Sequence, residues 1–318
     1  MVALKDPGML KKFAYQNFKY ANFESVCHEK VKANLDIMAR ALSRNETAWE
    51  TIFRKPVTKT WTQVKVAIKI NSMGKYNPSV SIVSKVCEVL NKLGIPFESI
   101  TLYDGGRASG EACPLKYGPF RDSGMIPPVN IISRGETHEI TVDGLGATFC
   151  PVVVWDADIL VNIAVNKGHD RVNQFGGVSM SLKNHVGTIN FTHPQDIKTL
   201  CSYHMHEAIL GRPSQDVPPK QQLIILDSLW VGVPRSYLGT IEKPLQTLIM
   251  GVFPGAVDYL TTRKIRERVY PMNPININES IVNSYIENFG YTSEERKMLD
   301  DINPETDPQG RGLVEINL

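Results

Sequence analysis

The sequence predicts an α/β fold with a mainly parallel or mixed sheet, flanking helices, an N-terminal helical extension and a small β insertion. Short apolar segments alternate with stretches of helical periodicity, which is the pattern of a sheet covered by helices. One such succession, over residues 64–103, has the short links of a βαβ unit. In addition, a dense polar segment follows an apolar run, and open α/β sheets place their ligands beyond such strand ends.

The first 58 residues are rather polar and predict a helical extension that packs on the main domain. Apolar residues recur at helical spacing between Val31 and Leu42. Asn45 interrupts this pattern, and Pro56 closes the segment. The predicted division of the chain is an extension over 1–58, an α/β domain over 59–302 with an insertion at 105–150, and an irregular tail over 303–318.

The α/β domain begins with an alternating strand at 64–70. Apolar residues at helical spacing over 79–93 predict the helix that follows, and Gly94 predicts its C-terminal cap. A second strand at 100–103 completes the unit. A strand, a helix and a strand joined by short links imply a parallel pair with a right-handed crossover.

Residues 105–150 are rich in glycine and proline, and within them residues 129–132 and 138–142 predict a small hairpin or an edge insertion. The apolar runs 152–154 and 158–165 predict a return to the core of the sheet. The remaining predicted elements are a helix at 194–210, short strands at 223–226 and 247–250, and helical sequence at 255–269 and 279–288.

The composition excludes several classes of protein. With 318 residues, 42% of them hydrophobic, the chain is long and apolar enough to fold around a substantial core. A net charge of +2 gives no case for binding nucleic acid. The five cysteines lack Cys-x-x-Cys spacing, which argues against a zinc ribbon or a ferredoxin-type cluster. No apolar run approaches the roughly 18 residues of a membrane span.

The compartment stays open at the level of sequence. The first residues lack the apolar core of a signal peptide, and a leader removed before this chain begins would leave the same appearance. We therefore expect either the cytoplasm or, after removal of a leader not present in this chain, the periplasm.

The polar segment after the apolar run 159–165 supplies the predicted catalytic residues. His169 lies beside Lys167 and Asp170, and a neutral histidine is a common metal ligand and proton carrier whose tautomer an adjacent carboxylate can fix. His193 precedes a predicted helix N-terminus, where backbone N–H groups favour an anion. The residues predicted to be catalytic are Lys167, His169, Lys183 and His193.

Substrate-binding residues are predicted from the strand ends and from the same polar segment. Paired glycines let a backbone approach a ligand or form an anion-binding nest, and lysine adds a compact positive charge. The residues predicted to bind substrate are Lys69, Asn71, Gly176, Gly177, Asn184 and His185. A divalent metal ion is the cofactor that this pattern allows, with His169, His193, Asp227 and Asp258 as its ligands; each aspartate could equally cap a helix.

Six motifs follow one another along roughly residues 60–270, namely Val66-Ala-Ile-Lys-Ile-Asn71, Lys167-Gly-His169, Ser181-Leu-Lys-Asn-His-Val-Gly187, His193, Leu226-Asp227 and Pro254-Gly-Ala-Val-Asp258. In this order they resemble the domain of unknown function 362 family. The resemblance implies an α/β fold, and it marks as site residues Lys69, Asn71, Lys167, His169, Lys183, Asn184, His193, Asp227 and Asp258. It implies no particular reaction.

The chain departs from the family pattern in two places. Ile70 stands where proline is usual, and Phe253 stands where an aspartate usually precedes Pro254, which puts a ligand at that position in doubt. Some relatives carry a cysteine-rich ferredoxin segment that this chain lacks, so we expect no iron–sulfur cluster. Others are exported by a twin-arginine signal. A fainter similarity links the chain to nickel-dependent lactate racemase-like proteins.

Three functions are compatible with these residues. The first is an enzyme with a site lined by lysine and histidine, metal-assisted or not, that performs redox or isomerisation chemistry on a small carboxylate-type anion. The second is a protein that binds an anionic small molecule or a metal ion without turnover. The third is a structural or interaction protein, in which the lysines would project into solvent.

Overall fold

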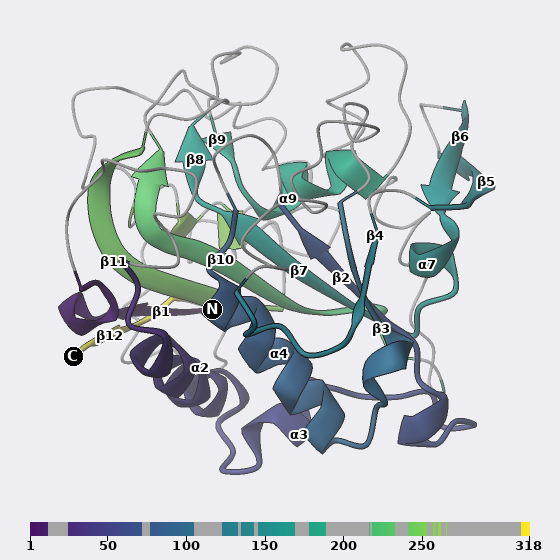
Figure 1. The fold of residues 1–318 in the computed structure, drawn as a ribbon, viewed down its shortest axis with the longest axis horizontal. Coiled ribbons are helices and arrows are strands. Elements are labelled where there is room, and N and C mark those ends of the chain that lie inside the picture. The colour runs from purple at the N-terminus through teal and green to yellow at the C-terminus, as the bar shows by residue number, and fades with distance from the viewer. Residues whose placement is uncertain are drawn as a thin grey trace, which may run out of the picture.

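Eight strands form one mixed sheet in the order β12-β1-β11-β10-β7-β2-β3-β4, which confirms the predicted α/β class (Figure 1). The computed structural model describes residues 1–11, 25–71, 77–104, 123–132, 135–142, 146–168, 178–188, 216, 218–232, 241–252, 257, 258, 260, 261, 265 and 313–318. The strands are β1 (Val2–Lys5), β2 (Val66–Ile70), β3 (Ile100–Tyr103), β4 (Asn130–Ile132), β7 (Ile159–Val165), β10 (Gln221–Gly232), β11 (Ile241–Gly251) and β12 (Val314–Asn317).

Within this sheet, β11 runs opposite to its two neighbours, β1 and β10, and every other neighbouring pair is parallel. All residues of β2, β3 and β7 are buried, as expected for central parallel strands that are covered on both faces. The carboxyl ends of β10, β7, β2 and β3 therefore lie along one edge of the sheet. Polar residues that follow these strands are brought close together there.

The predicted βαβ unit is confirmed: β2 leads into α4 (Val80–Lys92), which leads into β3, and the two strands are parallel. Gly94 ends this helix with a φ of 102°, in the left-handed region. Its N–H group donates to the carbonyl of Asn91 at 2.9 Å, and that of Ile95 donates to the carbonyl of Leu90 at 3.3 Å. This pair of bonds satisfies two carbonyls that the helix end would otherwise leave unpaired.

Replacing Gly94 by alanine should lower the free energy of unfolding by about 1–2 kcal/mol, because a side chain disfavours the left-handed backbone. The added Cβ would also lie 3.3 Å from the Cβ of Trp61. Urea denaturation of Gly94→Ala and Gly94→Asn measures the effect. Asparagine tolerates this backbone better, so equal losses in the two variants would contradict the explanation.

Helices α2 (His28–Ser43), α3 (Ala48–Ile52) and α4 lie together below the strands in Figure 1. The helix predicted over 31–42 is confirmed by α2. Two ion pairs join α2 to α4, from Lys32 to Glu88 at 2.7 Å and from Lys85 to Asp36 at 2.6 Å. None of the described helices combines the length and the apolar composition needed to cross a bilayer.

Both ends of the described chain add strands that the sequence did not predict. Residues 2–5, placed by the sequence in a helical extension, form β1 between β11 and β12. Residues 314–317, placed in an irregular tail, form the edge strand β12. Each strand has four residues, and its partners are remote in sequence, so local periodicity carries little signal for it.

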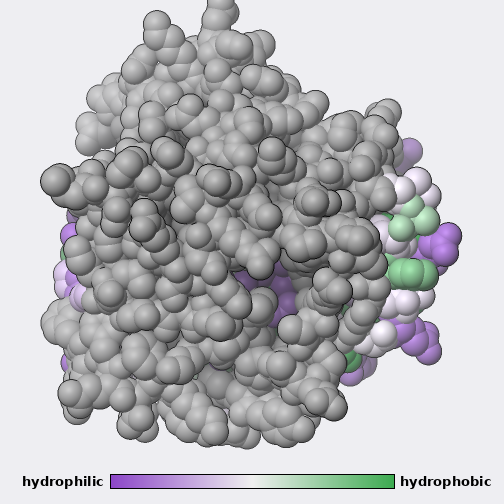
Figure 2. All heavy atoms as spheres, turned by 90° about the horizontal axis from the view of Figure 1, so that it is seen from above, coloured by the Kyte–Doolittle hydropathy of each residue, from purple (hydrophilic) through white to green (hydrophobic). Residues whose placement is uncertain are grey.

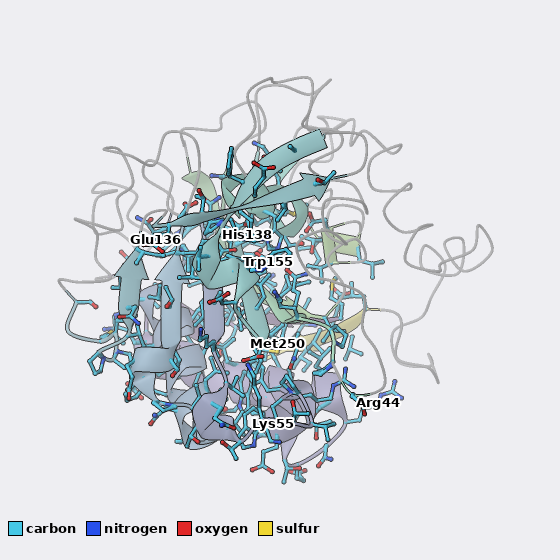
Figure 3. The ribbon with its side chains drawn as sticks, turned by 90° about the vertical axis from the view of Figure 1, so that its right-hand side faces the viewer. Arg44, Lys55, Glu136, His138, Trp155 and Met250 are labelled. Atoms are coloured by element: carbon cyan, nitrogen blue, oxygen red, sulfur yellow. The ribbon has the colours of Figure 1, made fainter. Side chains whose placement is uncertain are left out.

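Both strands predicted within the insertion are present, and the first is an edge strand of the main sheet, but the two do not pair with each other. Residues 130–132 form β4 and extend the main sheet next to β3, while the hairpin consists of β5 (Thr137–Val142) and β6 (Gly146–Pro151). Residues 152–155 form the short helix α7 (Val152–Trp155) after Pro151, although three successive valines favour a strand. The rings of His138 and Trp155 stack with their centroids 4.3 Å apart and join the hairpin to this helix (Figure 3).

The later part of the chain is described only in pieces. The predicted strand 223–226 is part of the longer β10, which continues to Gly232 with an irregular register between Ser228 and Trp230. The predicted strand 247–250 is the last part of the longer β11. The predicted helices at 194–210 and 279–288, and most of 255–269, lie outside the described residues.

Candidate functional site

A cluster of polar residues lies at the carboxyl edge of the parallel strands, and all of its members are buried. We call it the edge cluster. Its five residues come from four places: Lys69 and Asn71 at the end of β2, Asp104 after β3, Lys167 in the two-residue strand β8 (Lys167–Gly168) that follows β7, and Asn184 in the short helix α9 (Ser181–Asn184).

The ammonium group of Lys69 has a full set of acceptors. Its Nζ donates to the Ile70 carbonyl at 2.7 Å, to Oδ1 of Asp104 at 2.9 Å and to Oδ1 of Asn184 at 3.2 Å. An ammonium group carries three N–H donors, so these bonds use all of them. Lys69 therefore ties β2, β3 and α9 together and fixes a positive charge at their junction.

Asn184 and Asn71 extend this network towards β7. Nδ2 of Asn184 donates to Oδ1 of Asn162 at 2.8 Å, while its Oδ1 accepts from Nδ2 of Asn71 at 3.4 Å. Oδ1 of Asn71 in turn accepts from Nζ of Lys167 at 2.8 Å. The two lysines are thus linked through two asparagine amides.

Burial of Lys167 raises the free-energy cost of keeping its side chain protonated. Burial lowers the pKa of its ammonium group to about 8; the negative charge of Asp104 opposes this shift, and the positive charge of Lys69 adds to it. A buried ammonium group beside a second one is strongly attracted to an anion, because little water screens the interaction.

His185 lies in a second layer on the sheet side of α9. Its Nε2 lies 2.6 Å from Oε1 of Gln221 and 3.1 Å from Nδ2 of Asn162. Its Nδ1 lies 3.1 Å from Oγ1 of Thr188. That threonine hydroxyl in turn contacts the hydroxyl of Tyr103 at 3.0 Å. Burial lowers the pKa of His185 to about 4, against the opposing effect of the Gln221 hydrogen bond. His185 is thus held by the side chains of Gln221, Asn162 and Thr188, and its contact with substrate stays a prediction.

Asp227 and Asp258 each accept a hydrogen bond from the backbone at the start of a helix, and Asp227 accepts a second one from within β10. The carboxylate of Asp227 accepts from the backbone N–H groups of Ser79, the residue before α4, at 2.6 Å and of Leu229 at 3.0 Å. Burial raises the pKa of Asp227 to about 6, although both hydrogen bonds act to lower it. Asp258 accepts from the backbone N–H of Ser181 at 2.9 Å and from its hydroxyl.

Neither aspartate is the N-cap residue of the helix whose N–H group it accepts from, so the metal-ligand and capping alternatives for both residues stay predictions. In the described part of the chain, no three histidine, cysteine, aspartate or glutamate residues are grouped so that they could hold a metal ion. His169 and His193 lie outside the described residues. The metal site therefore stays a prediction.

The structure brings together four of the predicted site residues, namely Lys69, Asn71, Lys167 and Asn184. Lys183 lies in α9 and is half-buried. Gly176 and Gly177, like the two histidines, lie outside the described residues. In a structural or interaction protein, the predicted lysines would project into solvent. Lys69 and Lys167 are instead buried.

Two residues of the network were not assigned to a site from the sequence. Asp104 is recognisable as the polar residue after β3, but nothing local shows that it pairs with Lys69. Asn162 is buried in the middle of the apolar strand β7, and its Nδ2 donates to the Ser181 carbonyl at 2.9 Å. A single amide within an apolar strand was the available signal, because a buried amide requires partners.

Strands β8 and β9 (Val178–Ser179) pair antiparallel and lie with α9 above the main sheet in Figure 1. Figure 2 looks from above onto this side of the molecule, and hydrophilic atoms are visible near the centre of the view. This is the side on which parallel α/β sheets bind their ligands.

The chain is thus an α/β protein with a buried lysine–asparagine cluster at the carboxyl edge of its parallel strands. Residues 66–263 match the family model described as domain of unknown function, DUF362. The match covers more than half of the chain, which therefore belongs to this family. A search of curated proteins finds no match.

Proposed function

We propose that the chain is an enzyme that binds a small carboxylate-type anion at the edge cluster and performs redox or isomerisation chemistry on it. The observation that carries the proposal is the burial of two ammonium groups, those of Lys69 and Lys167, at the carboxyl ends of the adjacent parallel strands β2 and β7. Placing two like charges close together in a desolvated setting costs free energy, and a bound anion offsets that cost.

The two lysines have different tasks in this proposal. Lys69, whose three N–H groups are engaged, acts through its charge, while Lys167 and Asn71 contact the anion. Fixed positive charge of this kind stabilises negative charge that develops in a transition state. His169, two residues beyond Lys167, and His193 would move a proton or bind a divalent metal ion that polarises a substrate oxygen, and Lys183 would assist.

The second candidate is a protein that binds an anionic small molecule without turnover. One observation favours it: among the described residues, the edge cluster contains no histidine, and His185 has partners at both ring nitrogens. Incubation with L-lactate, with and without a two-electron acceptor, and with pyruvate, with and without a two-electron donor, separates the two functions, because isomerisation needs no partner and redox turnover needs one for the electrons. Product formation supports the enzyme, whereas binding without any product supports the binding protein.

Binding is tested by thermal shift of the purified protein with acetate, L-lactate and pyruvate, before and after dialysis against EDTA. We expect stabilisation by at least one carboxylate and an affinity about tenfold or more lower in Lys167→Met, because a charge-assisted hydrogen bond is lost. Lys65→Met is the matched control, since Lys65 is exposed and pairs with Asp156 away from the edge cluster. A wild-type protein that no carboxylate stabilises would contradict the proposal.

A further inference from the structure

The hairpin of β5 and β6 forms a two-stranded sheet of its own, which lies beside α7 at one side of the main sheet (Figure 1). The backbone N–H of Val152 donates to the carbonyl of Glu136 at 2.9 Å, next to the first pair of the hairpin. Because backbone groups along an antiparallel strand point alternately towards its partner and away from it, this bond fixes which residues of β5 face away from β6. These residues are Thr137, Glu139 and Thr141.

The edge of β5 formed by these three residues is free. Within the part of the chain that the structure describes, their outward N–H and C=O groups have no hydrogen-bond partner, and no third strand joins the hairpin. Unpaired groups of this kind can pair with an extended segment of another polypeptide, which then adds a strand to the sheet. The side chains around the edge decide which segment fits.

The hairpin has an exposed outer face and an attached inner face. On the outer face Glu139 is exposed and lies opposite Phe149 of β6, which is 42% exposed. On the inner face Ile140 is buried, and the ring of His138 stacks on Trp155 of α7 (Figure 3). A strand added to β5 therefore meets a polar environment on one face and an apolar environment on the other.

The charge along the free edge is negative. Among the described hairpin residues, 135–142 and 146–151, the charged side chains are those of Glu136 and Glu139, and both residues are exposed. Neither carboxylate forms an ion pair within the described chain. A segment that carries lysine or arginine complements this charge, because opposite charges on neighbouring strands attract each other.

We propose that the free edge of β5 is a docking site for an extended basic segment of a partner protein. Successive residues of such a segment lie on opposite faces of the enlarged sheet. Residues on the outer face lie beside Glu139, where a basic side chain is favoured, and residues on the inner face lie beside Ile140, where an apolar side chain is favoured. The partner segment therefore alternates basic and apolar residues. None of the residues of the edge cluster takes part in this contact.

The charge requirement is tested with a fluorescent octapeptide of alternating lysine and valine, whose binding is followed by anisotropy at low salt. We expect the wild-type protein to bind it and Glu139→Lys to bind it about fivefold or more weakly, because attraction becomes repulsion. Glu50→Lys makes the same change of charge at an exposed residue of α3 and should bind like wild type. Equal losses in the two variants would reduce the contact to net charge and overturn the docking site.

Strand pairing is tested with two further peptides, one N-methylated at every lysine and the other at every valine. Each blocks one edge of the peptide, so pairing with β5 should strongly weaken the binding of one of them and leave the other nearly unaffected. Both peptides are added to wild-type protein, so this test does not depend on the folding of a variant. Equal binding of the two methylated peptides would exclude strand addition and overturn the inference.

Thr137→Pro tests the edge from the side of the protein. Proline removes an N–H group that points away from β6, a position where a strand tolerates it, and the variant should bind the octapeptide more weakly. Sedimentation velocity without peptide should give the same oligomeric state for this variant and for wild type. A wild-type dimer that Thr137→Pro dissociates would assign the edge to a second copy of the chain. Wild-type protein that does not bind the octapeptide would show that the glutamates only protect the edge. Either result would overturn the inference.

Discussion

Replacing Lys69 by methionine is expected to lower the free energy of unfolding by about 3–5 kcal/mol, the largest effect of any single change proposed for this chain. Lys69 is 1% exposed, and its Nζ lies 2.9 Å from Oδ1 of Asp104. Methionine fills a similar volume but leaves Asp104 buried without its ammonium partner, and oxygen atoms of Asn184 and Ile70 lose a donor. Urea denaturation measures the loss.

Two comparisons show whether the loss comes from the ion pair. In Lys69→Met/Asp104→Asn the uncompensated carboxylate is gone, so the double variant should be more stable than Lys69→Met alone. Lys65→Met removes an exposed lysine that pairs with a half-exposed Asp156 and should change stability little. A double variant that is less stable than Lys69→Met would contradict the assignment of a buried ion pair.

The second large effect concerns pH. The contribution of His185 to the free energy of unfolding should fall by up to about 3 kcal/mol as pH is lowered from about 6.5 to about 4, because His185 is buried in the folded chain. Burial raises the pKa of Asp227 to about 6, and this residue acts in the opposite direction below that pH, so the contribution of His185 is measured as the difference from a variant that lacks it. Burial lowers the pKa of His185 in the folded state from 6.5 to about 4. Between these values the unfolded chain binds a proton that the folded chain does not, so acid favours unfolding; above pH 6.5 the contribution is constant. Urea denaturation at a series of pH values gives the slope.

His185→Gln identifies the residue responsible for this slope. Glutamine can still donate or accept hydrogen bonds at this place but does not titrate, so the stability that the variant loses at pH 7 should shrink as pH falls from 6.5 to 4. His138→Gln is the matched control, because His138 is an exposed histidine stacked on Trp155. An unchanged slope in His185→Gln would show that another group controls the response to acid.

The central part of the fold was predictable because its signals are local. The alternating strand before α4, the helical spacing within it and Gly94 after it define the βαβ unit without reference to any distant residue. The positions of β1, β4 and β12 were not predictable in this way. Each is a strand of three or four residues whose place depends on a neighbouring strand rather than on its own pattern.

The site was predictable in part for a similar reason. Polar residues directly after parallel strands must meet at one edge, which is why Lys69, Asn71 and Lys167 could be grouped from the sequence. Their hydrogen bonds depend on side-chain geometry across four chain segments. The pairing of Asp104 with Lys69 and the bond from Asn162 to α9 therefore required a structure.

The position of β1 has a consequence for how the chain acquires its fold. β1 pairs with β11 and β12, so Val2 lies opposite Met250 on one side and Val314 on the other. Contacts between residues so distant in sequence carry a high loop-closure entropy and are associated with slow folding. During synthesis on the ribosome, this half of the sheet can be completed only after residues 314–317 have left the exit tunnel, so β1 must wait for all of the chain between it and β12.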